Sequence, residues 1–139
     1  MKRTETRELT FRLIYSTEIQ KDMDDEQKDI YIEENEITNN EEIKYINSVY
    51  NGIKENKDRI EKLISENLKE KWTIERISKI DIAILKVAIY ELIYSELPYK
   101  IVINEAVELA KKYGDDSSRA FVNGVLASVV KKEKLADEE

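Results

Sequence analysis

The sequence predicts an all-α protein, a helical bundle of about six to seven helices, and two observations lead to this fold class. The longest apolar stretch, Arg76–Tyr94, is apolar nearly all round a helix, with Lys86 the only charge between Ile82 and Tyr90. A helix of this kind has to be covered on most sides, and the stretch is too long for a strand. In addition, three Gly and one Pro among 139 residues leave little material for hairpin turns.

The first third of the chain predicts one amphipathic helix followed by an acidic segment. The helix runs from about Thr4 to Gln20, with Phe11 and Ile14 on its apolar stripe. Its N-terminal end is basic, because several cations lie off that stripe or at its edge: Lys2, Arg3, Arg7 and Arg12. The acidic segment Asp22–Asn40 has few apolar anchors, so we expect it to be the most mobile part, with at most one short helix.

The next elements lead into the central helix. A helix over Glu41–Gly52 is predicted to end at Gly52, a residue type common just after a helix, and a further helix carries the apolar residues from Ile53 to Leu68. Thr73 is a candidate N-cap for a short first turn. At the start of the central helix, Ser78 and Asp81 have the spacing of a capping box, with Asp in place of Glu.

Two more helices follow the central one. The first begins past Pro98, which disfavours a helical residue before it, and ends at Gly114. Asp115 and Asp116 offer N-caps for the last helix, and Lys131–Glu139 is expected to fray. Gly124 lies inside the last helix at a cost of ~1 kcal/mol relative to Ala, so we expect close helix packing there.

The composition excludes several classes of protein. The chain has no Cys and no His, which removes disulfides, thiolate chemistry and the commonest general base and metal ligand. The 30 acidic residues lie at surface spacing and single out no catalytic pair. We therefore expect a single non-enzymatic domain over residues 1–139, with no catalytic residue, metal or cofactor. No apolar run approaches the ~20 residues of a membrane span, and the N-terminal residues lack the apolar stretch of a signal peptide, so we expect a cytoplasmic protein.

The net charge of −7 is unevenly distributed. Glu18–Glu36 holds nine acids against two bases, which accounts for the whole excess, and the rest of the chain has 21 of each. The overall acidity therefore does not exclude a local basic patch or a nucleic-acid partner.

Several long motifs in order closely resemble those of the NusB family of bacterial transcription antitermination factors. They are Arg7-Glu8 with Leu13-Ile14-Tyr15, then Asp81 to Leu92, Pro98 to Gly114, Ser118, and Phe121 to Leu126. The resemblance implies an all-helical fold with an N-terminal half (about 1–70) packed on a C-terminal half (about 71–135). It also implies binding of single-stranded boxA RNA from ribosomal RNA operon leaders together with the NusE ribosomal protein. The pair would join the RNA polymerase elongation complex with other Nus factors, without catalysis and without contact to membrane or DNA.

The resemblance and the local chemistry point to candidate RNA-binding residues, namely Lys2, Arg3, Arg7, Tyr15, Lys100 and Arg119. Guanidinium groups and rings suit phosphates and unpaired bases. Arg119 lies in the first turn of a helix, where the dipole does not favour a cation, so a functional use is indicated. Thr4 and Glu5 stand where relatives often have arginines, so the N-terminal end of the first helix has fewer positive charges than in those relatives. At helical spacing from Phe11, Tyr15 fits the core as well as a ligand contact.

Asp81 and Lys86 are the candidate contacts to a protein partner. Asp81 matches an acidic family position associated with NusE, although it also stabilises a helix start. Lys86, a lone charge on an apolar helix, must snorkel, pair or face a partner. Asn104 and Glu105 are expected to cap or tie backbone near the start of their helix.

The sequence therefore predicts an RNA-binding antitermination factor. Two alternatives stay open: a non-catalytic helical protein–protein scaffold, and a stand-alone relative of the RNA-binding domain of RNA cytosine methyltransferases.

Overall fold

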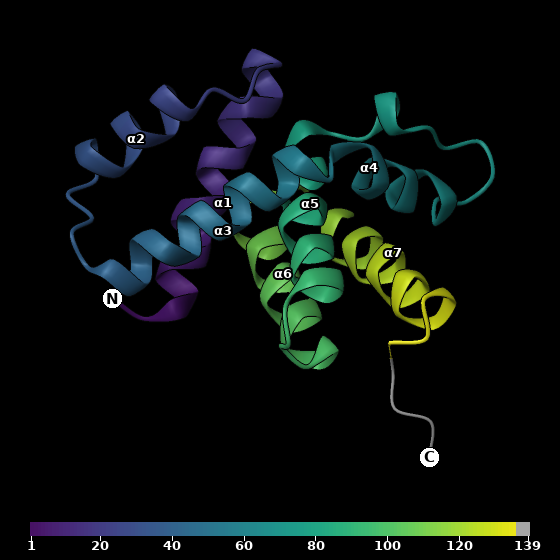
Figure 1. Ribbon diagram of the computed structural model, residues 1–139. Helices are drawn as coiled ribbons and strands as arrows, with labels where there is room; N and C mark the ends of the chain where they lie inside the picture. The colour runs from purple at the N-terminus through teal and green to yellow at the C-terminus, as the bar shows by residue number, and fades with distance from the viewer. Residues whose placement is uncertain (136–139) are drawn as a thin grey trace.

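The computed structural model describes residues 1–135, and within them the chain forms seven α-helices, one short 3-10 turn and no strand (Figure 1). The elements are α1 (Arg3–Gln20), α2 (Asp25–Glu34), α3 (Asn40–Glu55), α4 (Lys57–Glu66), η1 (Ile74–Arg76), α5 (Lys79–Tyr94), α6 (Tyr99–Tyr113) and α7 (Ser118–Lys132). This confirms the all-α fold class. In the described part of the chain, no helix combines the length and the apolar character needed to cross a membrane.

Helix α5 is the core of the molecule, as its apolar sequence predicts. The helices α1, α3, α4, α6 and α7 all pack against it. Ile84, Leu85 and Ile89 are completely buried, and Figure 1 shows α5 in the middle of the bundle. A helix that is apolar nearly all round is stable only when it is enclosed in this way.

The acidic segment holds one helix, α2, at the periphery of the bundle (Figure 1). Asp24 caps it by accepting a hydrogen bond from the backbone of Glu26. Two tyrosine hydroxyls tie the segment to its neighbours: Tyr31 donates to the carbonyl of Leu9 at 2.7 Å, and Tyr50 donates to that of Asp24 at 3.1 Å. The segment is therefore anchored at both ends of α2, and its greater mobility stays a prediction.

Two glycines have roles that differ from the predicted ones. Gly52 does not end a helix, because α3 continues to Glu55. Instead, the ring of Tyr90 lies where a Cβ at this position would stand, so the close approach of α3 and α5 requires a glycine. Gly124, expected to allow close packing, has no heavy atom within 4 Å of the corresponding Cβ position. That prediction was wrong, and Gly124 faces open space.

The helix ends partly follow the predicted caps. Ser78 accepts a hydrogen bond from the backbone N–H of Asp81 at 3.1 Å, as in a capping box. The last helix begins later than predicted, since Ser117 rather than Asp115 or Asp116 occupies the N-cap position. Asp115 instead accepts from the backbone of Ser117 at 2.9 Å and so shapes the turn before α7.

The predicted fraying of Lys131–Glu139 is not seen as far as Leu135, because the backbone N–H groups of Glu133, Lys134 and Leu135 donate to carbonyls of α7. Lys131 and Lys132 still belong to α7. Residues 136–139 lie outside the described part of the chain.

Candidate RNA interface

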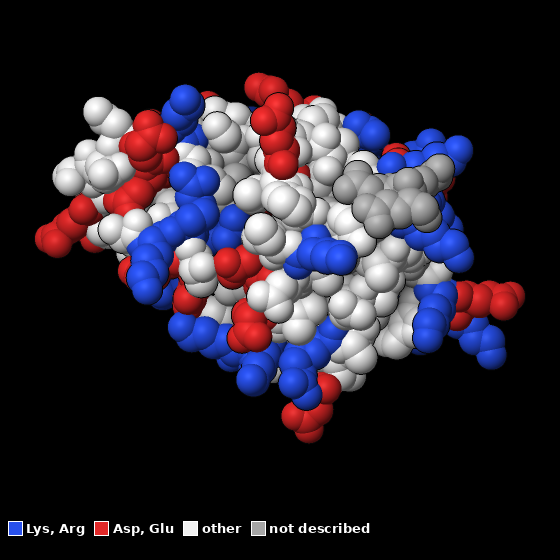
Figure 2. Space-filling view, turned by 90° about the horizontal axis from the view of Figure 1, so that it is seen from below, with Lys and Arg blue, Asp and Glu red and all other residues white. Residues whose placement is uncertain are grey.

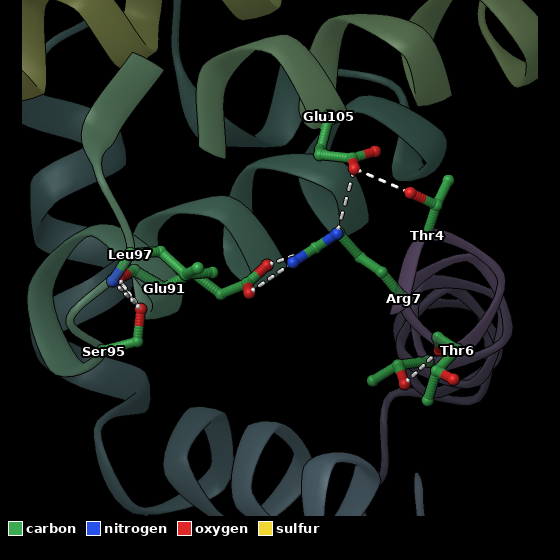
Figure 3. Close-up of polar contacts among 8 residues, drawn as sticks. Thr4, Thr6, Arg7, Glu91, Ser95, Leu97 and Glu105 are labelled. Carbon is green, nitrogen blue, oxygen red and sulfur yellow. Dashed lines mark hydrogen bonds and ion pairs between the residues drawn. The ribbon is translucent and has the colours of Figure 1, made fainter. Parts of the chain in front are cut away.

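Arg7 is not a surface cation in this structure. Its side chain is only 4% exposed and extends from α1 between α5 and α6 (Figure 3). Nε and a terminal nitrogen donate to the two carboxylate oxygens of Glu91 at 2.8 and 3.0 Å, and Glu105 lies 3.3 Å away. Burial lowers the pKa of the guanidinium, but the hydrogen bonds to Glu91 and the interactions with Tyr45, Glu91 and Glu105 together raise the pKa above its ordinary value, so Arg7 stays charged. The prediction that Arg7 contacts RNA is wrong in this structure, because the group is buried and already paired.

Glu105 belongs to the same cluster and does not cap its own helix. It also accepts a hydrogen bond from the hydroxyl of Thr4 at 2.8 Å (Figure 3). The start of α1 is thus tied to α6 by Thr4 and to α5 by Arg7.

Lys86 is likewise buried and paired, so the structure selects one of the three alternatives predicted for it. Its Nζ lies 2.9 Å from a carboxylate oxygen of Glu18 and 3.1 Å from one of Glu61, and its side chain is 5% exposed. The lysine therefore links α1, α4 and α5. Its predicted contact to a protein partner is wrong for this structure, because the side chain is buried and its charge is already paired with two carboxylates.

Tyr15 is half-buried and lies beside Phe11 with 6.4 Å between ring centroids and an angle of 26° between ring planes. This arrangement follows the core alternative more closely than the ligand alternative. Any RNA contact of Tyr15 stays a prediction.

The other predicted cations are exposed: Lys2, Arg3, Lys100 and Arg119. None of them forms an ion pair with a carboxylate of residues 1–135. The guanidinium of Arg3 lies over the ring of Tyr45, 4.3 Å from its centroid, an attractive contact that leaves the cation accessible.

These four cations do not form one cluster. Lys2 and Arg3 lie at the start of α1, which the Thr4–Glu105 bond places beside the N-terminal half of α6, where Lys100 lies. Arg119 follows the other end of α6, roughly 20 Å away along that helix. Seen from below, basic side chains lie along several edges of the face with acidic ones between them (Figure 2). The positive surface is therefore interrupted.

Sequence reasoning missed a groove of about 650 Å³ between the α4–α5 connection and α7. Trp72 and Phe121 form its aromatic wall, with ring centroids 6.1 Å apart and a 45° angle between planes. Trp72 is 51% exposed. On α7 the small residues Ala120 and Gly124 are part of the wall, and the space beside Gly124 is open.

The groove carries charges of both signs. Three bases line it: Lys69, Arg76 and Lys132. Lys132 donates to the carbonyl of Glu66 at 3.0 Å, and so the end of α7 lies beside the end of α4. The acids Asp81 and Asp115 line the part of the groove near the starts of α5 and α7. The groove lining is thus net positive although the whole chain is acidic.

Asp81 is the unusual polar group of this groove. It is only 7% exposed, and its Oδ1 has no hydrogen-bond donor among the described residues. Burial raises the pKa of the Asp81 carboxyl, and the negative charge of Asp115 adds to the rise, while the hydroxyls of Ser118 and Ser78 oppose it. A buried carboxylate oxygen without a donor costs free energy, so Asp81 is an energetically unfavourable group at this position.

The sequence gives little indication of the groove. Trp72 and Phe121 are far apart in the chain, and only the packing of η1 and α5 beside α7 brings them together. One feature of the sequence could have indicated the groove. Trp72 lies in a polar connection, and no apolar stripe beside it would bury its side chain.

Comparisons with known proteins agree with the family resemblance. A family model described as "NusB family" matches residues 4–131. The transcription antitermination protein NusB of Clostridium novyi is 45% identical over 134 residues, covering 94% of this chain and 99% of the relative. The protein of the same name from Acetivibrio thermocellus is 42% identical over 132 residues, covering 94% and 90%.

Solved structures are similar over almost the same length. A crystal form of T. maritima NusB has a TM-score of 0.85 at 35% identity, with 96% of each chain covered. A chain from the crystal structure of the antitermination factors NusB and NusE in complex with dsRNA has a TM-score of 0.83 at 26% identity, covering 95% of this chain and 99% of that one.

Proposed function

The chain belongs to the NusB family, and from this membership we propose that it is an RNA-binding transcription antitermination factor that acts together with a NusE-type ribosomal protein. The observation that carries this proposal is the match, over nearly the whole chain, to an antitermination factor crystallised with NusE and dsRNA. The helices that would present an RNA surface are therefore the same in both proteins.

We propose that the RNA is boxA from the leaders of ribosomal RNA operons, bound unpaired. Unpaired bases expose π-faces and Watson–Crick edges, which aromatic side chains and polar groups recognise. The groove supplies an exposed indole and cations, and Arg119 adds an accessible charge two residues before Phe121 on α7. Lys2, Arg3 and Lys100 provide a second accessible basic region beside α1 and α6.

The action we propose is assembly and not chemistry. The bound pair would join the RNA polymerase elongation complex with other Nus factors in the cytoplasm, and no cofactor or catalytic residue is needed. Asp81 as a contact to NusE stays a prediction: Asp81→Lys is expected to weaken NusE binding more than RNA binding by the protein alone, and equal effects on both would indicate damage to the helix start.

Equilibrium binding to boxA RNA and to a scrambled RNA of equal length, with and without purified NusE, tests the proposal. We expect boxA to bind more tightly than the scrambled sequence, and NusE to increase the difference. Contacts to three phosphates of single-stranded RNA predict a slope of log K against log salt of about −2. If boxA and scrambled RNA bind equally with NusE present, the protein is a scaffold whose RNA contacts are incidental.

A further inference from the structure

We propose that Tyr45 is a positioning residue for RNA binding: its buried ring holds the guanidinium of Arg3 in the place where that group meets a phosphate of the unpaired RNA. Tyr45 itself does not touch the RNA and acts only through Arg3. This inference rests on the proposed RNA binding and adds to it a residue of α3 that prepares the basic end of α1.

Arg3 differs from the next arginine of the same helix in what surrounds its charge. Arg3 and Arg7 lie one turn apart on the same face of α1. Arg7 is buried and paired with the carboxylates of Glu91 and Glu105. Arg3 is exposed and forms no ion pair within residues 1–135. Its guanidinium carbon lies 4.3 Å from the centroid of the Tyr45 ring, so Arg3 is oriented by a ring and not by an acid.

A ring suits this role because it attracts a cation without neutralising it. The negative face of the aromatic π-system draws the guanidinium toward it. Burial raises the pKa of the Tyr45 phenol, so the ring carries no charge of its own. The guanidinium therefore keeps its positive charge and its fork of N–H donors for a phosphate. A carboxylate in the same place would compete with the phosphate for both.

The Tyr45 ring is itself held in place. It is only 8% exposed, and its helix α3 packs against α1 and α5. The guanidinium of Arg7 lies 5.8 Å from the centroid of the same ring, and two hydrogen bonds to Glu91 fix that guanidinium (Figure 3). Tyr45 thus gives Arg3 a fixed platform. A long side chain that is already oriented loses less conformational freedom when it binds a ligand.

The hydroxyl of Tyr45 is not needed for this role. It is buried and has no hydrogen-bond partner among the described residues, whereas the contact to Arg3 is made by the ring. Tyr45→Phe should therefore keep the function, and a ring of similar shape that does not attract a cation should lose it.

Two substitutions of similar shape separate the attraction of the ring for a cation from its packing. Tyr45→Phe keeps the negative π-face. Tyr45→pentafluorophenylalanine, introduced during translation, keeps a ring whose fluorines withdraw electron density, so that its face no longer attracts a cation. Each full-length variant is titrated into labelled boxA RNA with purified NusE present, and the anisotropy of the RNA gives the affinity. Thermal unfolding checks that each variant is folded at the temperature of the titration.

We expect Tyr45→Phe to bind boxA within about twofold of the unmodified chain, and the fluorinated variant to bind about three- to tenfold more weakly. In an Arg3→Ala background the two variants should bind equally, because no guanidinium remains for the ring to position. The matched control is the same pair of substitutions at Tyr50, a completely buried tyrosine of α3 whose ring centroid lies 5.6 Å from Nζ of Lys28. That pair should show no difference in RNA affinity.

Three results would overturn the inference while leaving RNA binding intact: equal affinity of the two Tyr45 variants, a difference that persists in the Arg3→Ala background, or a difference of the same size at Tyr50. The first would show that attraction between the ring and a cation does not contribute to RNA binding. The other two would show that fluorination acts through the fold and not through Arg3. If the unmodified chain binds boxA and scrambled RNA equally with NusE present, the proposed function itself fails, and this inference fails with it.

Discussion

Arg7 of α1 and Glu91 of α5 form an ion pair with two hydrogen bonds, and both side chains are at least 95% buried. The pair lies where the N-terminal helix crosses the central one, and Glu105 of α6 lies beside it. Lys2 and Arg3, which remain accessible, stand one to two turns before it. The pair therefore determines where the basic end of α1 is held.

Substitution of Arg7 is expected to affect stability first. Arg7→Ala leaves Glu91 buried without its partner, and breaking such a pair costs about 3–5 kcal/mol. Urea unfolding of the variant should show this loss, whereas Arg12→Ala, on the exposed face of the same helix, should stay within about 0.5 kcal/mol. A loss of RNA affinity in Arg7→Ala with unchanged stability would contradict this role.

Arg3→Glu is expected to show the opposite behaviour. Arg3 is exposed, and its contact with Tyr45 is worth about 0.5–1 kcal/mol, so the melting temperature should change little. If the side chain meets one RNA phosphate, the slope of log K against log salt should become less negative by about 0.7. Lys44→Glu, an exposed base of α3 outside the proposed surface, serves as the control. An unchanged slope would remove Arg3 from the RNA surface.

The two helical glycines should respond to alanine with opposite signs. Gly52→Ala places a methyl group where the Tyr90 ring lies and is expected to cost about 1–3 kcal/mol. Gly124→Ala meets no atom and should stabilise the protein by up to about 1 kcal/mol through helix propensity. Denaturant unfolding of both variants under the same conditions gives the comparison, and a shift in the same direction for both would contradict the packing described.

Asp81 predicts a pH dependence whose sign follows from its raised pKa. A carboxyl whose pKa is higher in the folded than in the unfolded state destabilises the protein when ionised. This penalty is absent below the ordinary value of 3.8, sets in as the pH rises, and is complete above the folded-state pKa. Asp81→Asn removes the charge, so its melting temperature relative to the wild type should be higher at about pH 7 than at about pH 4. Thermal unfolding at the two pH values measures it, with Asp116→Asn as control, and a difference that is constant with pH would show that Asp81 carries no such penalty.

The local patterns of the sequence predicted most of the fold. The apolar spacing located the helices, and the nearly all-apolar run of α5 placed it correctly in the core, because burial is the only stable arrangement for such a helix. The boundaries were less exact: α3 continues past Gly52, and α7 begins at Ser118 after a turn shaped by Asp115. A glycine can end a helix or allow another helix to approach closely, and an aspartate can cap a helix or shape the turn before it. The sequence alone does not distinguish these roles.

The candidate site was predicted only in part. Arg7 and Lys86 look like free cations along the chain, yet their carboxylate partners come from helices far away in sequence. Conversely, Trp72, Phe121 and Asp81 line one groove only because η1, α5 and α7 meet.

By itself, then, the sequence determined the helical class, the central helix and the membership of the NusB family, since these depend on local periodicity and on motifs read along the chain. Only the tertiary structure decided that the charges of Arg7 and Lys86 are buried and paired inside the bundle. It also decided that Gly52 is in close contact with another helix and that Gly124 faces a groove. The physical reason is that the burial and pairing of a side chain depend on neighbours that only the folded chain brings within a few ångströms.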